Sequence, residues 1–202
     1  EMKTALLITP KSQIVPAMEN VDYIGVDAGA LLIEEAGYPC LLAIGDFDSM
    51  DADALQALKE RMEVIQHPVK KNETDSELAI RLCKERGYTS IILWGGLSNR
   101  LDHTLLNIQL LKHNPDLVVL QDEKQKVSIL QKGEHILKNA YRHISFFPLE
   151  ESILTLEGLL YPLDHRLIEV SDLYLTSNSF VEKEAHVLVE KGSLLCVESN
   201  YQ

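Results

Sequence analysis

Cysteine is scarce in this sequence, and its spacing excludes two common ways of stabilising a chain. The 202 residues include only Cys40, Cys83 and Cys196, an odd number without a C-x-x-C pair. A disulfide framework needs paired cysteines, and a structural zinc site needs closely spaced ligands. We therefore expect neither, and free thiols favour a reducing, cytoplasmic location.

Long apolar runs and an excess of basic residues are also missing. No run approaches the roughly 18 apolar residues that cross a bilayer, and Met2-Lys3 leads directly into a strand-like segment, so we expect no signal peptide. Lys and Arg number 19 against 31 Asp and Glu. Because nucleic acids and anionic membranes bind clustered cations, we expect neither as a partner, and a phosphate ligand has to arrive with a metal.

The familiar nucleotide-binding motifs are absent as well. The sequence contains neither the Walker pattern G-x-x-x-x-G-K-[ST] nor the protein-kinase set. Asp46-Phe47-Asp48 is not a D-F-G element, because Asp48 stands where the glycine belongs. Those nucleotide-binding folds are thereby disfavoured.

Short apolar runs alternate with amphipathic segments over residues 1–122. The segments at 51–62, 74–86 and 101–113 have helical periodicity. The apolar runs are Ala5–Ile8, Tyr23–Val26, Leu41–Ile44, Val64–Ile65, Ile91–Trp94 and Leu117–Leu120. This alternation predicts a Rossmann-like α/β domain, in which helices connect the strands of a parallel sheet.

The periodicity changes to two after the charged stretch at 121–126, which predicts a smaller all-β domain at residues 127–202. We expect a hairpin in which Val187–Val189 turns at Lys191-Gly192 into Leu194–Val197. The other expected strands are Val127–Leu130, His143–Phe147, Ile153–Leu156 and Leu173–Thr176.

Polar residues follow three of the apolar runs in the first domain. Ligands of open α/β sheets bind outside the carboxyl ends of the strands, so these residues are the first candidates for a site. They are Asp27-Ala28-Gly29-Ala30, then Gly45-Asp46-Phe47-Asp48-Ser49, then Gly95-Gly96-Leu97-Ser98-Asn99-Arg100. One edge of the sheet is therefore expected to collect carboxylates, glycines and an arginine.

Asp46 and Asp48 have the spacing of a cation site. In an extended segment, residues i and i+2 point the same way, so both carboxylates can reach one hard cation while Phe47 turns toward the core. Oxygen ligands of this kind suit Mg²⁺. The alternative is that Asp48 and Asp51 place acid in the first turn of the next helix, as the helix dipole favours.

Two further segments allow a functional and a plain structural interpretation. Thr74-Asp75-Ser76-Glu77 matches a capping box, which makes Asp75 either a site carboxylate or an ordinary first-turn acid. Gly95-Gly96 and Arg100 can bind a phosphate through backbone N–H groups and a guanidinium. The alternative for this segment is a turn before a helix capped by Asn99, with Asp102 in its first turn.

The remaining candidates are weaker in isolation. His103 and Asn107 lie four residues apart on one helix face, which fits a hydrogen-bonding or ligand-packing pair better than zinc. Trp94 ends an apolar run and is expected in the core. Ser177-Asn178 by itself is an ordinary turn.

Taken together and in order, these segments resemble the thiamine pyrophosphokinase family, over nearly the whole chain and both domains. The likeness also includes Gly158 to Leu163 and Thr176-Ser177-Asn178. The sequence departs from the family pattern at Asn72, where an acid is usual after Lys71, and at Asn99, where a glycine commonly precedes the arginine.

The resemblance implies an enzyme in which the hydroxyl of thiamine attacks the β-phosphorus of ATP, giving thiamine diphosphate and AMP. It also implies a C-terminal β-sandwich, and a homodimer whose site lies between one subunit's catalytic domain and its partner's β domain. The implied Mg²⁺ ligands are Asp46, Asp48 and Asp75, and Ser177 and Asn178 are implied to bind thiamine. The residues implied beside ATP and the reacting groups are Asp27, Gly29, Gly95, Gly96, Arg100, Asp102, His103 and Asn107.

Three questions stay open at this point. Either Asp75 or Asp102 can orient the thiamine hydroxyl or accept its proton. Clustered aspartates also serve Mg²⁺-dependent phosphohydrolases, which use water as the nucleophile. A non-catalytic thiamine or nucleotide sensor on the same fold is the third alternative, with Asn72 as a first sign of lost activity and the aspartates as evidence against it.

Overall fold

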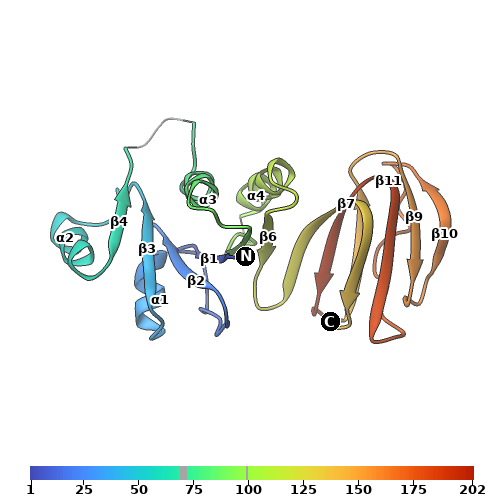
Figure 1. Cartoon of the computed structure of the whole chain (residues 1–202), viewed down its shortest axis with the longest axis horizontal. Coiled ribbons are helices and arrows are strands. Elements are labelled where there is room, and N and C mark those ends of the chain that lie inside the picture. The colour runs from blue at the N-terminus through green and yellow to red at the C-terminus, as the bar shows by residue number, and fades with distance from the viewer. Residues whose placement is uncertain (69–71, 99) are drawn as a thin grey trace. The chain divides into compact units, whose positions relative to one another are not determined.

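The structure is a computed structural model that describes residues 1–68, 72–98 and 100–202. The chain forms two compact units (Figure 1), the first comprising Glu1–Leu110 and Leu120–Glu123 and the second comprising Leu111–Val119 and Lys124–Gln202. Among the helices of the described residues, none has the length and apolar character to span a membrane.

The first unit is an α/β structure with a parallel sheet, as predicted. Its strands follow the order β5-β1-β2-β3-β4, and every neighbouring pair is parallel. The elements up to residue 121 are β1 (Thr4–Ile8), β2 (Asp22–Val26), α1 (Gly29–Glu35), β3 (Cys40–Gly45), α2 (Ala52–Arg61), β4 (Glu63–Gln66), α3 (Asp75–Glu85), β5 (Ser90–Trp94), α4 (Leu101–His113) and β6 (Val118–Gln121). All six predicted apolar runs lie in strands, except that Leu117 precedes β6, and the three amphipathic segments form α2, α3 and α4.

The sheet is covered by helices, which explains why its strands read as continuous apolar runs. Helices α1 and α3 both pack against β2 and β3 (Figure 1). Trp94 is buried among Leu6, Ile8 and Ile33, and its indole N–H donates to the carbonyl of Ile14 at 2.9 Å. The prediction that Trp94 belongs to the core is confirmed.

Short polar side chains fix where two of the helices begin. Asp51 is the N-cap of α2 and accepts a hydrogen bond from the Ala54 N–H at 2.8 Å. Thr74 caps α3 and accepts from the Glu77 N–H at 3.1 Å, as the capping-box pattern predicts. Helix α1 was not predicted, because it has only seven residues and no side-chain cap.

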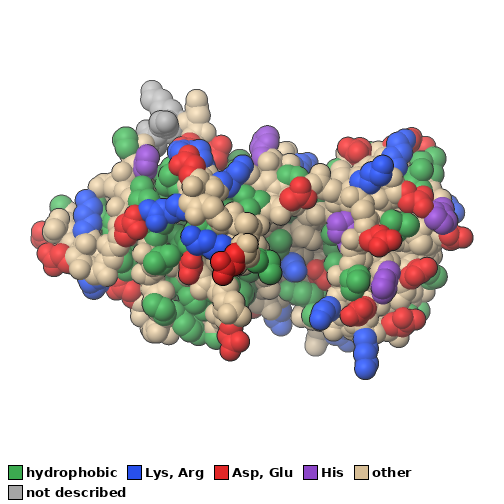
Figure 2. All heavy atoms as spheres, viewed as in Figure 1, with side chains coloured by type: hydrophobic (Ala, Val, Ile, Leu, Met, Phe, Trp, Pro, Cys, Tyr) green, Lys and Arg blue, Asp and Glu red, His purple; other side chains and the backbone are tan. Residues whose placement is uncertain are grey.

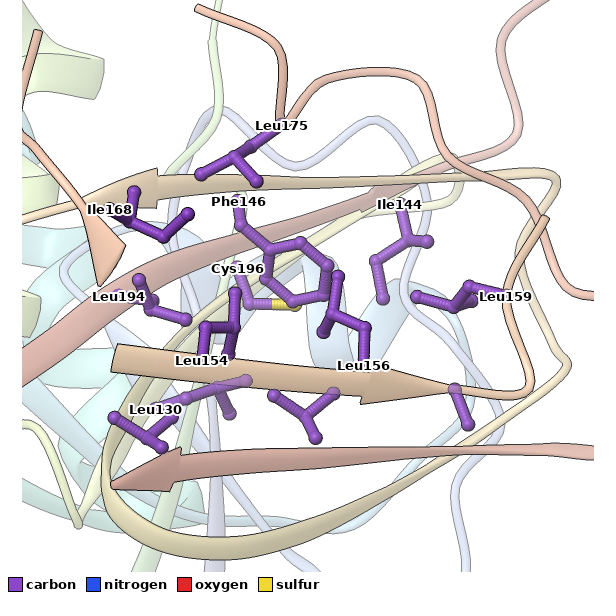
Figure 3. Close-up of a cluster of buried hydrophobic side chains, with 13 residues drawn as sticks. Leu130, Ile144, Phe146, Leu154, Leu156, Leu159, Ile168, Leu175, Leu194 and Cys196 are labelled. Atoms are coloured by element: carbon purple, nitrogen blue, oxygen red, sulfur yellow. The ribbon is translucent and has the colours of Figure 1, made fainter. Parts of the chain in front are cut away.

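The second unit is an antiparallel β-sandwich. Strands follow the order β10-β9-β11-β7, and β8 also pairs with β11. The strands are β7 (Gln125–Lys138), β8 (His143–Pro148), β9 (Ser152–Glu157), β10 (Leu163–Ile168) and β11 (Glu184–Ser199). Figure 3 shows Phe146 of β8 facing Leu154 and Leu156 of β9 in the buried core that these strands enclose.

The predicted hairpin at Lys191-Gly192 is wrong, because β11 continues through it as one strand. Lys191-Gly192 instead lies at a bulge where the pairing register with β7 and β9 shifts. Gly192 has φ +85°, and a Cβ there would meet the Ser152 hydroxyl oxygen at 2.2 Å. The glycine thus allows Ser152 to approach the backbone of a continuous strand. The local sequence does not distinguish this bulge from a turn.

The expected strand at Leu173–Thr176 is also wrong. That segment is irregular, although the Leu175 carbonyl accepts a hydrogen bond from the Phe146 N–H at 2.9 Å. Isolated bridges follow it, between Asn178 and Ile144 and between Phe180 and Leu159. Strand β10 was missed because its sequence, LDHRLI, has little alternation and its residues are mostly exposed at the edge of the sheet.

Charged side chains of both signs are interspersed on the surface. On the face shown in Figure 2, acidic side chains lie between the basic ones in each unit. The formal net charge is −12.

Candidate active site

The carboxyl ends of the parallel strands of the first unit lie level with one another. Ile8, the last residue of β1, pairs with Gly25 and with Trp94, and Gly45 at the end of β3 pairs with Gln66 at the end of β4. Residues that directly follow these strands therefore emerge at the same edge. This is the edge where ligands of open α/β sheets bind.

Three carboxylates meet at this edge. Asp27 follows β2, Asp46 follows β3, and Asp75 opens α3. One oxygen of each lies within 4.8 Å of an oxygen of the other two. The grouping brings together Asp46 and Asp75, both predicted to bind the metal, with Asp27, which was predicted to lie beside the nucleotide.

Asp27 holds the loop after β3 in place. It is 8% exposed, and its Oδ1 accepts a hydrogen bond from the Phe47 N–H at 2.9 Å. Gly45 permits this approach, because a Cβ at Gly45 would meet Asp27 atoms at 3.1 Å. Asp27 itself adopts φ +51°, a left-handed conformation that Asp and Asn tolerate better than most residues. The local sequence therefore fits both the turn and the bond.

The expected extended conformation of Asp46-Phe47-Asp48 is wrong. Phe47 has φ +56° and is buried, and the Asp48 N–H donates back to Asp46 Oδ1 at 3.0 Å. The bond from Phe47 to Asp27 stabilises this bend. Asp48 is consequently exposed and outside the group of three, although the Asp46 carboxylate is close enough to raise the pKa of Asp48. It lies ahead of α2, whose cap is Asp51, so it is not a first-turn acid either.

Asp75 is the carboxyl group whose titration the site changes most. Burial, followed by the negative charges of Asp46 and Asp27, raises the pKa of Asp75 from 3.8 to about 6. Burying and crowding carboxylates in this way is unfavourable unless a proton or a cation neutralises them. A perturbed acid beside a cavity is characteristic of functional sites.

A cavity of about 250 Å³ adjoins the carboxylates on the same unit. Asp75 and Ser76 line it from α3, and His103 and Asn107 line it from α4. Its remaining walls are Thr9, Pro10, Lys11, Val26, Thr74, Gly95, Ser98 and Leu106. The pair predicted on one face of the fourth helix thus points into the cavity that Asp75 lines.

The glycines after β5 allow the chain to pack tightly at the cavity wall. Gly95 has φ +82°, and a Cβ there would meet the hydroxyl oxygens of Thr9 and Ser12 at 2.3 and 2.4 Å. The Asn107 amide donates to the Gly96 carbonyl at 2.8 Å and holds the loop against α4. Gly29, the first residue of α1, allows a different close approach, because a Cβ there would meet the Ile8 carbonyl oxygen at 1.9 Å.

Arg100 and Asp102 form an exposed ion pair. The guanidinium donates to both carboxylate oxygens, at 3.1 and 2.5 Å, and the two side chains are 61% and 63% exposed. This pairing lowers the pKa of Asp102. Exposed pairs contribute little to stability, so an incoming phosphate can compete for the guanidinium.

In the second unit, Asn178 is buried and makes several hydrogen bonds within the chain. Its Oδ1 accepts from the N–H groups of Tyr161 and Ser179, and its Nδ2 donates to the Tyr161 carbonyl, all at 3.0 Å. Ser177 is exposed and has φ +59°, with its N–H bonded to the Ser145 hydroxyl at 2.9 Å. Asn178 therefore fixes the segment around Tyr161, and the thiamine contacts of both residues stay predictions.

Comparisons with known proteins identify the family. The sequence model described as "Thiamin pyrophosphokinase, catalytic domain" matches residues 17–129, and the one described as "Thiamin pyrophosphokinase, vitamin B1 binding domain" matches residues 125–194. This chain belongs to the thiamin pyrophosphokinase family. Membership makes it a transferase of the diphosphokinase type.

Individual relatives of the thiamin pyrophosphokinase family agree over nearly the full length. The chain is 30% identical over 190 residues to the thiamine pyrophosphokinase of Bacillus subtilis (strain 168), covering 90% of this chain and 88% of the relative. The fold matches the crystal structure of thiamine pyrophosphokinase from Bacillus subtilis with a TM-score of 0.87 and 28% identity, covering 99% of this chain and 100% of that chain. For thiamin pyrophosphokinase from Geobacillus thermodenitrificans the TM-score is 0.84 at 26% identity, with 100% and 99% coverage.

Some predicted features of the thiamin pyrophosphokinase pattern lie outside the described residues, namely Lys71 and the proposed cap Asn99. Asn72 is described and exposed, ahead of the Thr74 cap. The sequence interpretation missed Thr9 and Lys11, which line the cavity. Both follow the first apolar run. The rule that ligands bind outside the carboxyl ends of the strands therefore applies to them as it does to the residues after the other strands.

Proposed function

We propose that this protein transfers the pyrophosphoryl group of Mg-ATP to the hydroxyl of thiamine and releases AMP. The observation that carries the proposal is the meeting of Asp27, Asp46 and Asp75 beside the cavity at the sheet edge. These carboxylates lie in the part of the chain that matches the family's catalytic domain. In this proposal the N-terminal domain binds the nucleotide, and the C-terminal domain, which matches the family's vitamin B1 binding domain, binds thiamine.

The three carboxylates fit a hard divalent cation such as Mg²⁺. They offer oxygen ligands only, they come from three different elements, and their mutual repulsion needs a positive charge. Asp27, Asp46 and Asp75 would hold the ion, with the exposed Asp48 next to them. The ion would neutralise charge on the migrating phosphates and on the leaving α-phosphate oxygen.

The protein's own task is mainly positioning, because phosphoryl-type transfer needs little covalent chemistry from side chains. Of the two candidate proton acceptors, Asp102 is paired with Arg100, and that pairing makes it the weaker base. Asp75 lines the cavity, which supports it as the group that orients the hydroxyl. Arg100 is available to a phosphate on the exposed surface.

We also propose that the protein acts in the cytoplasm as a homodimer, in which Ser177 and Asn178 of one subunit complete the site of the other. The buried Asn178 network gives the Tyr161 segment a defined conformation before any ligand binds. Preorganisation of this kind lowers the entropic cost of binding. In this arrangement the C-terminal domain of one subunit binds thiamine, and the N-terminal domain of the other subunit binds ATP.

The decisive experiment is a coupled assay of AMP release from ATP and Mg²⁺, with and without thiamine. A pyrophosphokinase releases AMP only when thiamine is present and makes one thiamine diphosphate per AMP. Equal release in its absence indicates a phosphohydrolase instead. Binding of both ligands without AMP indicates a sensor. EDTA should abolish the activity and excess Mg²⁺ should restore it.

A further inference from the structure

Lys11 lies at the cavity but precedes the part of the chain that matches the family's catalytic domain. It belongs to the polar segment Thr9-Pro10-Lys11-Ser12 that directly follows β1. Thr9 and Lys11 both line the cavity that Asp75 and Ser76 also line, whereas the family match begins at residue 17. Lys11 therefore lies outside the residues that the family's catalytic-domain model matches.

The Lys11 ammonium group is directed at the ring of His103. Its Nζ lies 2.7 Å from His103 Nδ1. An ammonium group has only donors, so Nδ1 accepts this bond and the ring proton of His103 is on Nε2. The pair therefore presents N–H donors from two side chains, the remaining N–H groups of Lys11 and the Nε2–H of His103.

The charges that line the cavity indicate which kind of ligand these donors bind. Among the described residues that line the cavity, Lys11 is the only lysine or arginine. Arg100, the cation that the sequence pattern emphasises, is not among the lining residues and is paired with Asp102. A polyphosphate held by one divalent cation keeps excess negative charge, and a lysine is a common point charge for binding it.

We infer that Lys11 is a further phosphate-binding residue, whose ammonium group and the Nε2–H of His103 together bind the polyphosphate of the nucleotide. The inference rests on the proposed function for the identity of the nucleotide. The recognised chemistry is a magnesium-bound polyphosphate, so AMP and thiamine should not depend on Lys11.

Equilibrium binding tests this assignment directly. Lys11→Met keeps the length of the side chain without its charge, and Lys11→Arg keeps the charge. Lys112→Met is the matched control, because Lys112 is an exposed lysine in the last turn of α4 and does not line the cavity. The probes are Mg-ATP, magnesium tripolyphosphate and AMP, titrated calorimetrically, with thermal unfolding to show that each variant is folded.

We expect Lys11→Met to weaken binding of Mg-ATP and magnesium tripolyphosphate about tenfold, a change of about 1.4 kcal/mol. Lys11→Arg should recover most of that loss, Lys112→Met should change affinity less than about twofold, and AMP affinity should not change. In the AMP-release assay, the KM for ATP should rise while the KM for thiamine stays the same.

Two outcomes would overturn the inference. One is unchanged polyphosphate affinity in Lys11→Met. The other is that His103→Ala alone reproduces the whole loss and Lys11→Met adds nothing to it, which makes Lys11 only a support for His103. If the unmodified protein releases no thiamine-dependent AMP, the proposed function fails, and the tripolyphosphate titration still decides the role of Lys11.

Discussion

The carboxylate of Asp27 and the backbone N–H of Phe47 are joined by a hydrogen bond of 2.9 Å. This bond ties the end of β2 to the loop after β3, and so it sets the direction of Asp46. Asp27 therefore serves the geometry of the site as well as its charge. Two substitutions separate these contributions.

Asp27→Asn keeps an oxygen acceptor for Phe47 and tolerates the left-handed φ of +51°, so we expect a stability loss below about 1 kcal/mol. It removes one charge from the metal group, and turnover should fall at least about a hundredfold. Asp27→Leu removes the acceptor too and should cost about 1–3 kcal/mol of unfolding free energy. Urea unfolding measures the stability of each variant, and AMP release measures its turnover. Equal stability of the two variants would contradict the role given to the bond.

Asp75→Asn should abolish turnover and leave the fold intact. The substitution nearly conserves volume, and it removes a carboxylate that burial and three negative neighbours destabilise at pH 7. In EDTA the variant should be at least as stable as the parent. Activity within about tenfold of the parent, about 1.4 kcal/mol of barrier, would exclude Asp75 from the metal site. Glu77→Gln, a charge change in the same helical turn, is the control.

Stabilisation by Mg²⁺ should decrease as the pH falls through about 6. The pKa of Asp75 is raised from 3.8 to about 6 in the metal-free fold, so its protonated form stabilises the fold below pH 3.8, and this contribution is lost as the pH rises through 6. Above pH 6 a cation replaces the proton, and between pH 6 and 4 the two compete. Thermal unfolding with Mg²⁺ or EDTA at pH 5 and 7.5 measures this. An equal Mg²⁺ shift at both values would contradict the prediction.

Asn178→Ala should affect thiamine and stability together. It removes three hydrogen bonds at 3.0 Å and leaves the N–H and carbonyl of Tyr161 without that partner, which should cost about 2 kcal/mol. The Tyr161 segment then loses its fixed conformation, and the KM for thiamine should rise more than the KM for ATP. Steady-state kinetics at varied thiamine and varied ATP separate the two. A change in the KM for ATP alone would disprove the assignment of the β domain to thiamine.

Two defective proteins should rescue each other if the active site is shared between subunits. A heterodimer of Asp75→Asn and Asn178→Ala carries both lesions in one site and none in the other. Random mixing makes about half of the dimers mixed and restores about a quarter of the parental sites. The test is to unfold and refold the variants together and measure AMP release at low thiamine. If mass analysis confirms exchange and activity stays at the mean of the two variants, each site lies within one chain.

Local sequence determined most of the architecture. Buried parallel strands read as continuous apolar runs and helices show their own period, so the six apolar runs and α2 to α4 were predictable. The caps of α2 and α3 are encoded by Asp51 and Thr74 themselves. The family resemblance depended on motifs, several of them at strand ends, which stand in order along the chain and need no coordinates to be recognised.

Tertiary structure decided what those motifs do with one another. The bend at Phe47 depends on Asp27, twenty residues earlier, and no local pattern predicts a hydrogen bond from a backbone N–H to a side chain over that separation. The same bond leaves Asp48 exposed and outside the group formed by Asp27, Asp46 and Asp75. Only the fold brings Lys11 to His103, because they lie on different elements 92 residues apart. The bulge at Gly192 was likewise set by β7 and β9, since pairing with neighbouring strands on both sides keeps β11 continuous where its sequence alone favours a turn.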